Sequence, residues 1–253
     1  MTAPVATVDQ DAALSLVARV LDERRVSAVP VVDGGAVVGV ISRADLVRVG
    51  RIQAGSHHRS PVLTLPQKRA GDLVREAKRA PIVVAPSTPL RQTAVTMLER
   101  RIHRVFVVEG RDLVGVVSTF DMMRAVRDAR IEQPITTIMS TPLFTINANQ
   151  PVSAAVERLE HARVTGLVVL DDDFPVGLFT QLEALQSRDL PRDTRIDEIL
   201  DPAMLCLPKT TKIYRAAEQA CRMEVRRVIP CHEREAVGIV TGMDFVKLVA
   251  ADH

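Results

Sequence analysis

One seven-residue pattern occurs four times along the 253-residue chain. It consists of glycine, two apolar residues, serine or threonine, two variable residues, and aspartate or glutamate. The copies are Gly39–Asp45, Gly115–Asp121, Gly177–Glu183 and Gly238–Asp244, and the glycine-to-glycine intervals are 76, 62 and 61 residues. Self-similarity at a nearly fixed period is the signature of a repeat architecture. The chain is therefore expected to fold as four copies of one small unit.

Each copy of the pattern is embedded in the same order of predicted elements. A short apolar run precedes an amphipathic helix of about three turns. A β-branched strand, a tight polar turn, a second strand and a short helix follow, and the second strand ends at the serine or threonine of the pattern. The longer helices are expected over residues 11–24, 89–100, 152–161 and 212–223. The fold class is α/β (α+β), with β-α-β-β-α in every repeat.

The spacing of the pattern also predicts the repeat boundaries. The repeats are expected at residues 1–50, 67–130, 131–190 and 191–253. Residues 51–66 explain the longer first interval, because they contain Gly, Ser and two prolines without helical periodicity, which predicts a long surface connection. One repeat of about 60 residues buries little surface alone, so pairs that share a core are expected.

Composition narrows the classes of function. Residues 1–130 hold 20 Lys and Arg against 13 Asp and Glu, whereas residues 131–253 hold 13 against 18. The basic half suits a polyphosphate ligand or an acidic partner. Nucleic acid is disfavoured, because aromatic residues make up 3% of the chain and tryptophan is absent, which leaves few platforms for stacking bases.

No run of about 20 apolar residues is present, and the first residues lack a basic segment followed by an apolar one, so we expect a soluble cytoplasmic protein without membrane attachment. Three cysteines without a C-x-x-C pair fit a reducing compartment. Cys231 and His232 lack the spacing of a metal site, so neither a metal nor a resident cofactor is expected.

The repeated pattern has a chemical interpretation of its own. A strand that ends in Ser or Thr and turns directly into a helix brings a hydroxyl, free backbone N–H groups and the positive end of the helix dipole to one point. This combination favours a phosphate. The carboxylate three residues later would repel a phosphate, so its expected partners are the vicinal hydroxyls of a ribose.

The alternative interpretation is structural. S-x-x-[DE] is also a capping box, in which both side chains satisfy backbone donors and need no ligand. Glu183 fits a capping box better than the aspartates do, so Thr180 is the weakest ligand candidate and the third repeat is expected to be scaffold. The remaining candidates are Ser42 with Asp45, Ser118 with Asp121, and Thr241 with Asp244.

With this pattern in all four repeats, the chain resembles four cystathionine-beta-synthase (CBS) domains in series. In that family, consecutive units associate about a pseudo-twofold axis into pairs, called Bateman modules, with ligand clefts between the sheets. Two pairs can form a flat disc, as in the gamma subunit of AMP-activated protein kinase. The resemblance thus implies two modules, at residues 1–130 and 131–253.

The resemblance also assigns roles to residues that enter the middle strand of a repeat. His103 and Arg104 in the second repeat match the family's phosphate-binding positions closely, and Arg226 and Arg227 in the fourth match them more loosely. The first and third repeats have Ser27-Ala28 and Thr165-Gly166 there. The alternative is that these charges are solvated and discourage edge pairing. Adenine would contact apolar residues near Val8, at 82–84 (Ile82 and Val84) and at 204–207.

The expected function is that of a non-catalytic regulatory sensor. Four repeats fill the sequence, and no nucleophile, Walker or metal-ligand pattern rises above background. The expected ligand is an adenine nucleotide or other adenosyl compound (AMP, ADP, ATP or S-adenosylmethionine), read out by a second copy or a partner protein. The competing hypothesis is an interaction module that forms a homodimer or docks on a partner, and whose patterns only cap helices. A weaker one is nucleic-acid binding through residues 1–130.

Overall fold

The computed structural model describes residues 1–53, 62–77, 80–162, 164, 166–200 and 204–251. The chain forms two compact units. The first contains Met1–Ser87, Val105–Val116 and Leu185–Pro191, and the second contains Thr88–Arg104, Val117–Ala184 and Arg192–His253.

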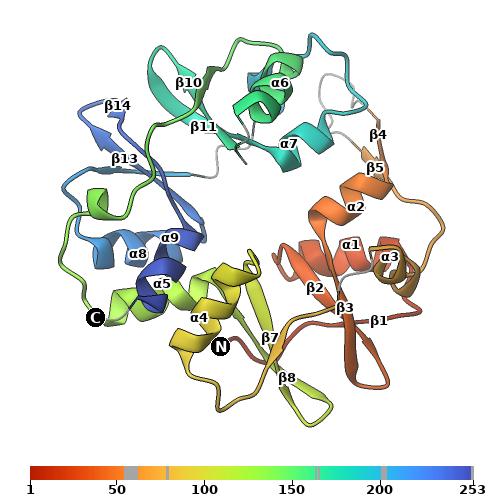
Figure 1. Ribbon diagram of the computed structural model, residues 1–253. Coiled ribbons are helices and arrows are strands. Elements are labelled where there is room, and N and C mark those ends of the chain that lie inside the picture. The colour runs from red at the N-terminus through yellow and green to blue at the C-terminus, as the bar shows by residue number, and fades with distance from the viewer. Residues whose placement is uncertain (54–61, 78–79, 163, 165, 201–203, 252–253) are drawn as a thin grey trace. The chain divides into compact units, whose positions relative to one another are not determined.

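The predicted order β-α-β-β-α is confirmed in all four repeats (Figure 1). The first two repeats comprise β1 (Val8–Asp9), α1 (Leu14–Glu23), β2 (Ala28–Asp33), β3 (Ala36–Ser42) and α2 (Arg43–Val49), then β6 (Val83–Val84), α4 (Leu90–Glu99), β7 (Arg104–Glu109), β8 (Asp112–Ser118) and α5 (Thr119–Asp128). The last two comprise β9 (Thr145–Asn147), α6 (Val152–Ala162), β10 (Gly166–Asp171), β11 (Phe174–Thr180) and α7 (Gln181–Gln186), then β12 (Leu205–Pro208), α8 (Ile213–Arg222), β13 (Arg227–His232), β14 (Glu235–Ala236), β15 (Val240–Thr241) and α9 (Gly242–Ala250).

Every repeat has a small mixed sheet with the same topology. The first strand pairs in parallel with the middle strand in each repeat. An antiparallel hairpin joins the middle and last strands, with Ala28 opposite Ser42, Gly166 opposite Thr180 and Arg227 opposite Thr241. The residue that enters the middle strand therefore lies beside the Ser or Thr that ends the last one.

The long helices form because their apolar residues recur at helical spacing. In α1 the buried residues are Leu14, Val17 and Leu21, and in α8 they are Ile213, Ala216, Ala217 and Ala220. These stripes cover the sheets of their own repeats. A residue with positive φ follows α1, α4 and α8 (Arg25, Arg101 and Glu224), and the next N–H bonds back into the helix, which turns the chain sharply into the middle strand.

Two features differ from the sequence prediction. The ends of the predicted connection 51–66 pair as a two-stranded antiparallel sheet, β4 (Arg51–Gln53) with β5 (Val62–Thr64), whereas 54–61 lie outside the described residues. A helix that was not predicted, α3 (Ala70–Ala77), precedes β6 and packs into the core of the first repeat through Ala70 and Leu73. The four repeat boundaries themselves stay a prediction.

The pattern glycines are explained by close packing of segments that lead into a neighbouring repeat. A Cβ atom on Gly39 would lie 2.3 Å from Val74 Cγ1, and one on Gly177 would lie 2.6 Å from Leu200 Cδ2. Likewise, a Cβ on Gly115 would meet Met1 Sδ at 2.5 Å, and one on Gly238 would meet Met139 Sδ at 2.7 Å. Repeats one and two thus exchange their leading segments, and so do repeats three and four. This exchange defines the two pairs.

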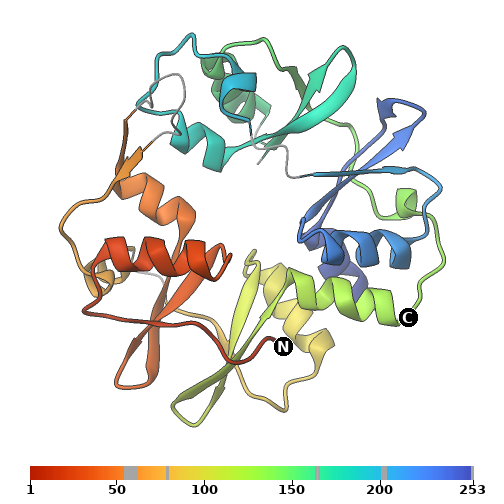
Figure 2. The ribbon, with the colours of Figure 1, turned by 180° about the vertical axis from the view of Figure 1, so that it is seen from behind.

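Repeats three and four also share an apolar core between their sheets. Val168 and Leu178 of the third repeat pack with Ile229 and Cys231 of the fourth. A second set of contacts in this compact unit joins the helices of repeats two and four. There, α5 packs on α8 and α9, and α4 packs on α9 (Figures 1 and 2). No helix among the described residues is long and apolar enough to cross a membrane.

Candidate functional site

The first helical residue of the pattern ties the helix N-terminus to the residue beside the middle strand. The amide of Thr119 donates to the carbonyl oxygen of His103 at 3.2 Å, and the amide of Gly242 donates to the carbonyl oxygen of Arg226 at 3.0 Å. In the first repeat, Arg43 donates in the same way to Ser27. The basic pairs predicted from the sequence are therefore fixed next to the N-termini of α5 and α9.

One carboxylate oxygen of every pattern is used inside its own repeat. Asp121 Oδ2 accepts from the Ser118 amide at 2.9 Å and from its hydroxyl at 3.0 Å. Asp244 Oδ2 accepts from the Thr241 amide at 2.8 Å and from its hydroxyl at 2.9 Å. Asp45 does the same for Ser42. The capping interpretation is thus correct for this oxygen.

The other carboxylate oxygen of the three aspartates faces an exposed cation. Asp45 Oδ1 pairs with Arg48 at 2.8 Å, Asp121 Oδ1 pairs with Arg124 at 3.4 Å, and Asp244 Oδ1 pairs with Lys247 at 2.8 Å. The cations keep more than half of their side-chain surface exposed, whereas Asp121 and Asp244 are almost fully buried. Capping therefore occupies one carboxylate oxygen of each aspartate, and the other oxygen pairs with a cation that reaches into solvent.

The third repeat differs from the others. Glu183 is 8% exposed and accepts from the amide of Thr180 at 2.8 Å and also from its hydroxyl. Position 186, three residues later, is Gln, so the exposed cation of the other repeats has no counterpart. The structural role of Thr180 and Glu183 stays a prediction.

The N-termini of α5 and α9 meet in close contact. A Cβ atom on Gly242 would lie 2.7 Å from Thr119 Cβ, so this approach requires glycine. Asp121 and Asp244, on the first turns of these helices, are 7% and 3% exposed. The Arg226 guanidinium lies over the ring of Phe120, 4.9 Å from its centroid. Residues from repeats two and four are thereby brought together.

Four basic side chains gather around this junction. Loss of surrounding water, followed by repulsion from Arg226, lowers the pKa of Arg104 to about 10. Burial, followed by repulsion from Arg227, lowers the pKa of Arg226. Burial also lowers the pKa of Arg227, and the nearby Glu183 carboxylate offsets part of that decrease. Together these residues and His103 form what we call the cation cluster: His103, Arg104, Arg226 and Arg227.

The three arginines of the cluster all affect the pKa of His103. Its side chain remains exposed, yet packed protein atoms remove part of its water and lower its pKa, and Arg104, Arg226 and Arg227 each lower it further. Like charges held this close disfavour protonation of the imidazole. The cluster therefore concentrates positive charge, to which an anionic ligand is complementary.

Eight of the ten main sequence-predicted ligand residues lie in the second compact unit: Ser118, Asp121, Thr241, Asp244 and the cation cluster. Ser42 and Asp45 lie in the first, where Asp45 is 26% exposed. Of the apolar candidates, Ile82 and Val84 are partly buried, and their neighbour Val83 is 49% exposed. Val8, Leu205 and Leu207 are core residues, and Thr165 lies outside the described residues.

Three features of the site were missed from the sequence. They are Phe120, the Thr119–Gly242 contact, and the cation three residues after each aspartate. The last carries a visible signal, because Arg48, Arg124 and Lys247 recur at the same offset in three copies. The contacts of Phe120 and Gly242 depend on which repeats pack together, which the pattern does not specify.

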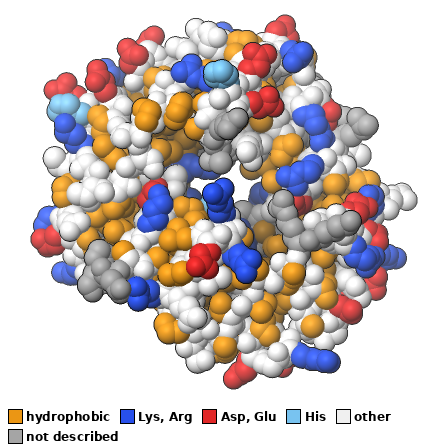
Figure 3. Space-filling model, in the orientation of Figure 1, with side chains coloured by type: hydrophobic (Ala, Val, Ile, Leu, Met, Phe, Trp, Pro, Cys, Tyr) orange, Lys and Arg blue, Asp and Glu red, His pale blue; other side chains and the backbone are white. Residues whose placement is uncertain are grey.

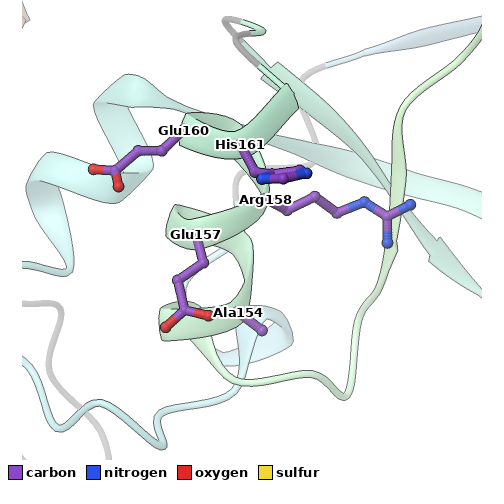
Figure 4. Close-up of a pocket in the computed structure, with 5 residues that line it drawn as sticks. All are labelled: Ala154, Glu157, Arg158, Glu160 and His161. Carbon is purple, nitrogen blue, oxygen red and sulfur yellow. The ribbon is translucent and has the colours of Figure 1, made fainter.

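The described surface also has features away from this site. A hollow along α6 is lined by Ala154, Glu157, Arg158, Glu160 and His161, all on one helix and none of them a predicted ligand residue (Figure 4). On the face drawn in Figure 3, Lys and Arg side chains are interspersed with Asp and Glu. Across the described part of the chain, no group of His, Cys, Asp and Glu is arranged to hold a metal ion, and the three cysteines are free thiols.

The family model described as "CBS domain" matches residues 1–51, 70–128 and 135–188, which is more than half of the chain. The chain belongs to the CBS domain family. Protein MJ1225 of Methanocaldococcus jannaschii is 23% identical over 192 residues, covering 68% of this chain and 69% of the relative. Its crystal structure, described as that of a proposed archaeal homolog of g-AMPK, matches 98% of this chain and 97% of its own, with a TM-score of 0.70 and 15% identity.

A structure from Pyrococcus horikoshii covers 98% of this chain and 97% of its own with a TM-score of 0.63 and 18% identity. These likenesses establish the fold. Two other solved structures are the CBS domain pair of MJ0100 in complex with 5′-methylthioadenosine and S-adenosylmethionine, and CBSX2 in complex with AMP. These structures cover 46% and 49% of this chain and 95% and 89% of their own, with TM-scores of 0.41 and 0.40 and identities of 21% and 25%.

Proposed function

We propose that this chain is a cytoplasmic, non-catalytic sensor that binds an adenine nucleotide through its phosphate groups at the cation cluster. The observation that carries the proposal is the gathering of Arg104, Arg226 and Arg227 with His103 beside two helix N-termini. Three partly buried guanidinium groups with lowered pKa values gain free energy when a phosphate replaces their lost water. Binding would be read out by a second copy or a partner protein.

The aspartates are assigned to the ribose in this proposal. Asp121 and Asp244 keep their Oδ2 atoms on the helix caps, while their Oδ1 atoms pair with Arg124 and Lys247, two exposed cations. Ribose hydroxyls would take the place of Arg124 or Lys247 at these atoms, because both cations are more than half exposed and can turn into solvent. In the first compact unit, Ser42 and Asp45 would form a separate ribose position, with apolar residues around Val83 as its adenine contacts.

The charge of the cluster separates the candidate ligands. AMP, ADP and ATP carry phosphate, whereas S-adenosylmethionine carries a sulfonium cation near its carboxylate. A cluster of cations with lowered pKa values favours the phosphates and disfavours the sulfonium. We therefore propose AMP, ADP or ATP as the ligand class.

The competing function is an interaction module whose patterns only cap helices. The capping hydrogen bonds favour it, because they are complete in the absence of ligand. That hypothesis gives no role to the cation cluster, whose members repel one another.

A panel of ligands distinguishes these functions. We expect AMP, ADP or ATP at about 100 times the Kd to stabilise the folded protein by roughly 2.7 kcal/mol and raise its melting temperature. Adenosine, which lacks phosphate, and S-adenosylmethionine are the matched controls and should shift it far less. Differential scanning fluorimetry measures the effect. Equal shifts of the melting temperature with adenosine and AMP would show that the cation cluster does not bind the phosphate. If millimolar nucleotide causes no shift, the interaction module remains as the function.

The pH dependence of His103 supplies a second test. Its pKa in the folded protein lies below 6.5, so the unfolded chain takes up the proton first as the pH falls. The stability contributed by this residue is therefore present above pH 6.5 and decreases as the pH drops from there through the folded pKa.

Bound phosphate should raise the pKa of His103, which an NMR titration of the imidazole signals with and without AMP would detect. His161, on α6 outside the cluster, is the internal control, and an unmoved His103 titration would place the phosphate elsewhere.

A further inference from the structure

The contact between Phe120 and Arg226 joins two repeats across the site. Phe120 is the third residue of the second repeat's S-x-x-D segment, between Thr119 and Asp121. Its ring packs against the apolar core of the fourth repeat and also lies under the guanidinium of Arg226, 4.9 Å from the ring centroid. An arginine of one repeat is therefore held by an aromatic ring of another.

The contact is energetically significant because Arg226 has lost much of its water. Burial and the neighbouring Arg227 both destabilise its charged form. A cation over an aromatic face recovers part of that cost, and the recovery grows as the cation becomes less hydrated. The ring thus adds a contact that restricts where the Arg226 guanidinium lies.

That position determines the shape of the cation cluster. Arg226 acts electrostatically on both His103 and Arg104 of the second repeat. Its backbone is fixed as well, since its carbonyl accepts from Gly242 at the α5–α9 contact. The equivalent of Phe120 in the fourth repeat is Met243, which has no aromatic face. The cation–π contact therefore joins an aromatic ring of the second repeat to an arginine of the fourth.

We infer that Phe120 is a positioning residue that makes repeats two and four one composite phosphate site. It holds Arg226 in register with His103 and Arg104, so a nucleotide phosphate is bound by both repeats at once. The inference rests on the proposed nucleotide-binding function and adds to it the residue that couples the two repeats.

The experiment compares Phe120→Leu and Phe120→Tyr in the full chain. Leucine preserves apolar packing and removes the ring, whereas tyrosine preserves the ring. We expect Phe120→Leu to weaken binding of AMP and ATP by about three- to tenfold in isothermal titration calorimetry. Phe120→Tyr should bind like the wild type, and Met243→Leu, at the same position of the fourth repeat, is the matched control.

A double-mutant cycle separates positioning from general packing. If Phe120 acts through Arg226, Phe120→Leu should have no additional effect on affinity when combined with Arg226→Gln. An equal loss of affinity in both backgrounds would overturn the inference while leaving the proposed function intact.

Titration of the His103 imidazole in the ligand-free protein tests the position of Arg226 without any nucleotide. Release of Arg226 from the ring should remove part of its repulsion of His103, so the His103 imidazole should titrate at higher pH in Phe120→Leu and not in Phe120→Tyr. Unchanged His103 titration in Phe120→Leu would show that the ring does not position Arg226. Absence of AMP and ATP binding by the wild type would instead overturn the proposed function, and with it the composite site.

Discussion

Replacement of Arg104 by glutamine is expected to weaken binding of AMP and ATP by about 10- to 100-fold, because a hydrogen bond to a charged group contributes about 1.5–3 kcal/mol. Without ligand, we expect the same variant to keep most of the stability of the wild type, because burial and Arg226 lower the pKa of Arg104 to about 10 and so destabilise its charge in the free protein. A loss of binding with preserved stability is the signature of a ligand-binding residue.

The control for this variant is Arg111→Gln. Arg111 is exposed in the turn between β7 and β8, so its replacement removes one positive charge from the same repeat without touching the cation cluster. Calorimetry and thermal melts of both variants would be compared at the same ionic strength, since exposed charges are screened by salt. Equal losses of affinity in both would mean that net charge, rather than the cluster, attracts the nucleotide.

The largest expected effect on stability comes from Gly39→Ala. The added methyl would lie 2.3 Å from Cγ1 and 2.5 Å from Cγ2 of Val74, and a β-branched side chain cannot rotate freely out of the way. Overpacking of this kind typically costs about 1–3 kcal/mol, so chemical denaturation should show a loss in that range.

Two further variants test the cause of that loss. Gly39→Ala combined with Val74→Ala should be more stable than the sum of the two single changes predicts, because the second change removes the atoms that clash. Gly115→Ala should cost less than Gly39→Ala, since its contacts are the Sδ, Cγ and Cε atoms of Met1, a flexible side chain. A double mutant with purely additive losses would contradict the packing explanation.

The repeat architecture could be predicted because its signals are local. Alternation in the hairpins and helical spacing in stripes such as Leu14, Val17 and Leu21 depend only on neighbouring residues. Helix α3 escaped prediction because its core-facing residues, Ala70 and Leu73, span a single turn and pack on the preceding repeat. Two apolar residues within one turn do not establish a helical period, and the helix is stabilised by its tertiary contacts.

The candidate site was predictable in its residues and not in its assembly. The basic pairs and the four S/T-x-x-[DE] segments are visible in the sequence, and the structure places each pair beside a helix N-terminus. Nothing in a repeat specifies that α5 and α9 will pack together, because that contact requires Gly242 in one repeat to face Thr119 in another. The spacing of the residues also does not distinguish capping from ribose binding. The two oxygens of each aspartate have different neighbours, and these neighbours are visible only in the structure.

The exchange of leading segments has a consequence for how the chain folds as it is synthesised. The first repeat lacks Val74, and the third lacks Leu200, until the ribosome has passed well beyond their own strands. The fourth repeat, in contrast, receives Met139 from a segment made about 100 residues earlier. Domains generally fold as units in the order of synthesis. Here the unit that completes its core during translation is the pair, so a stalled chain that ends between two paired repeats would expose an unfilled groove at the pattern glycine.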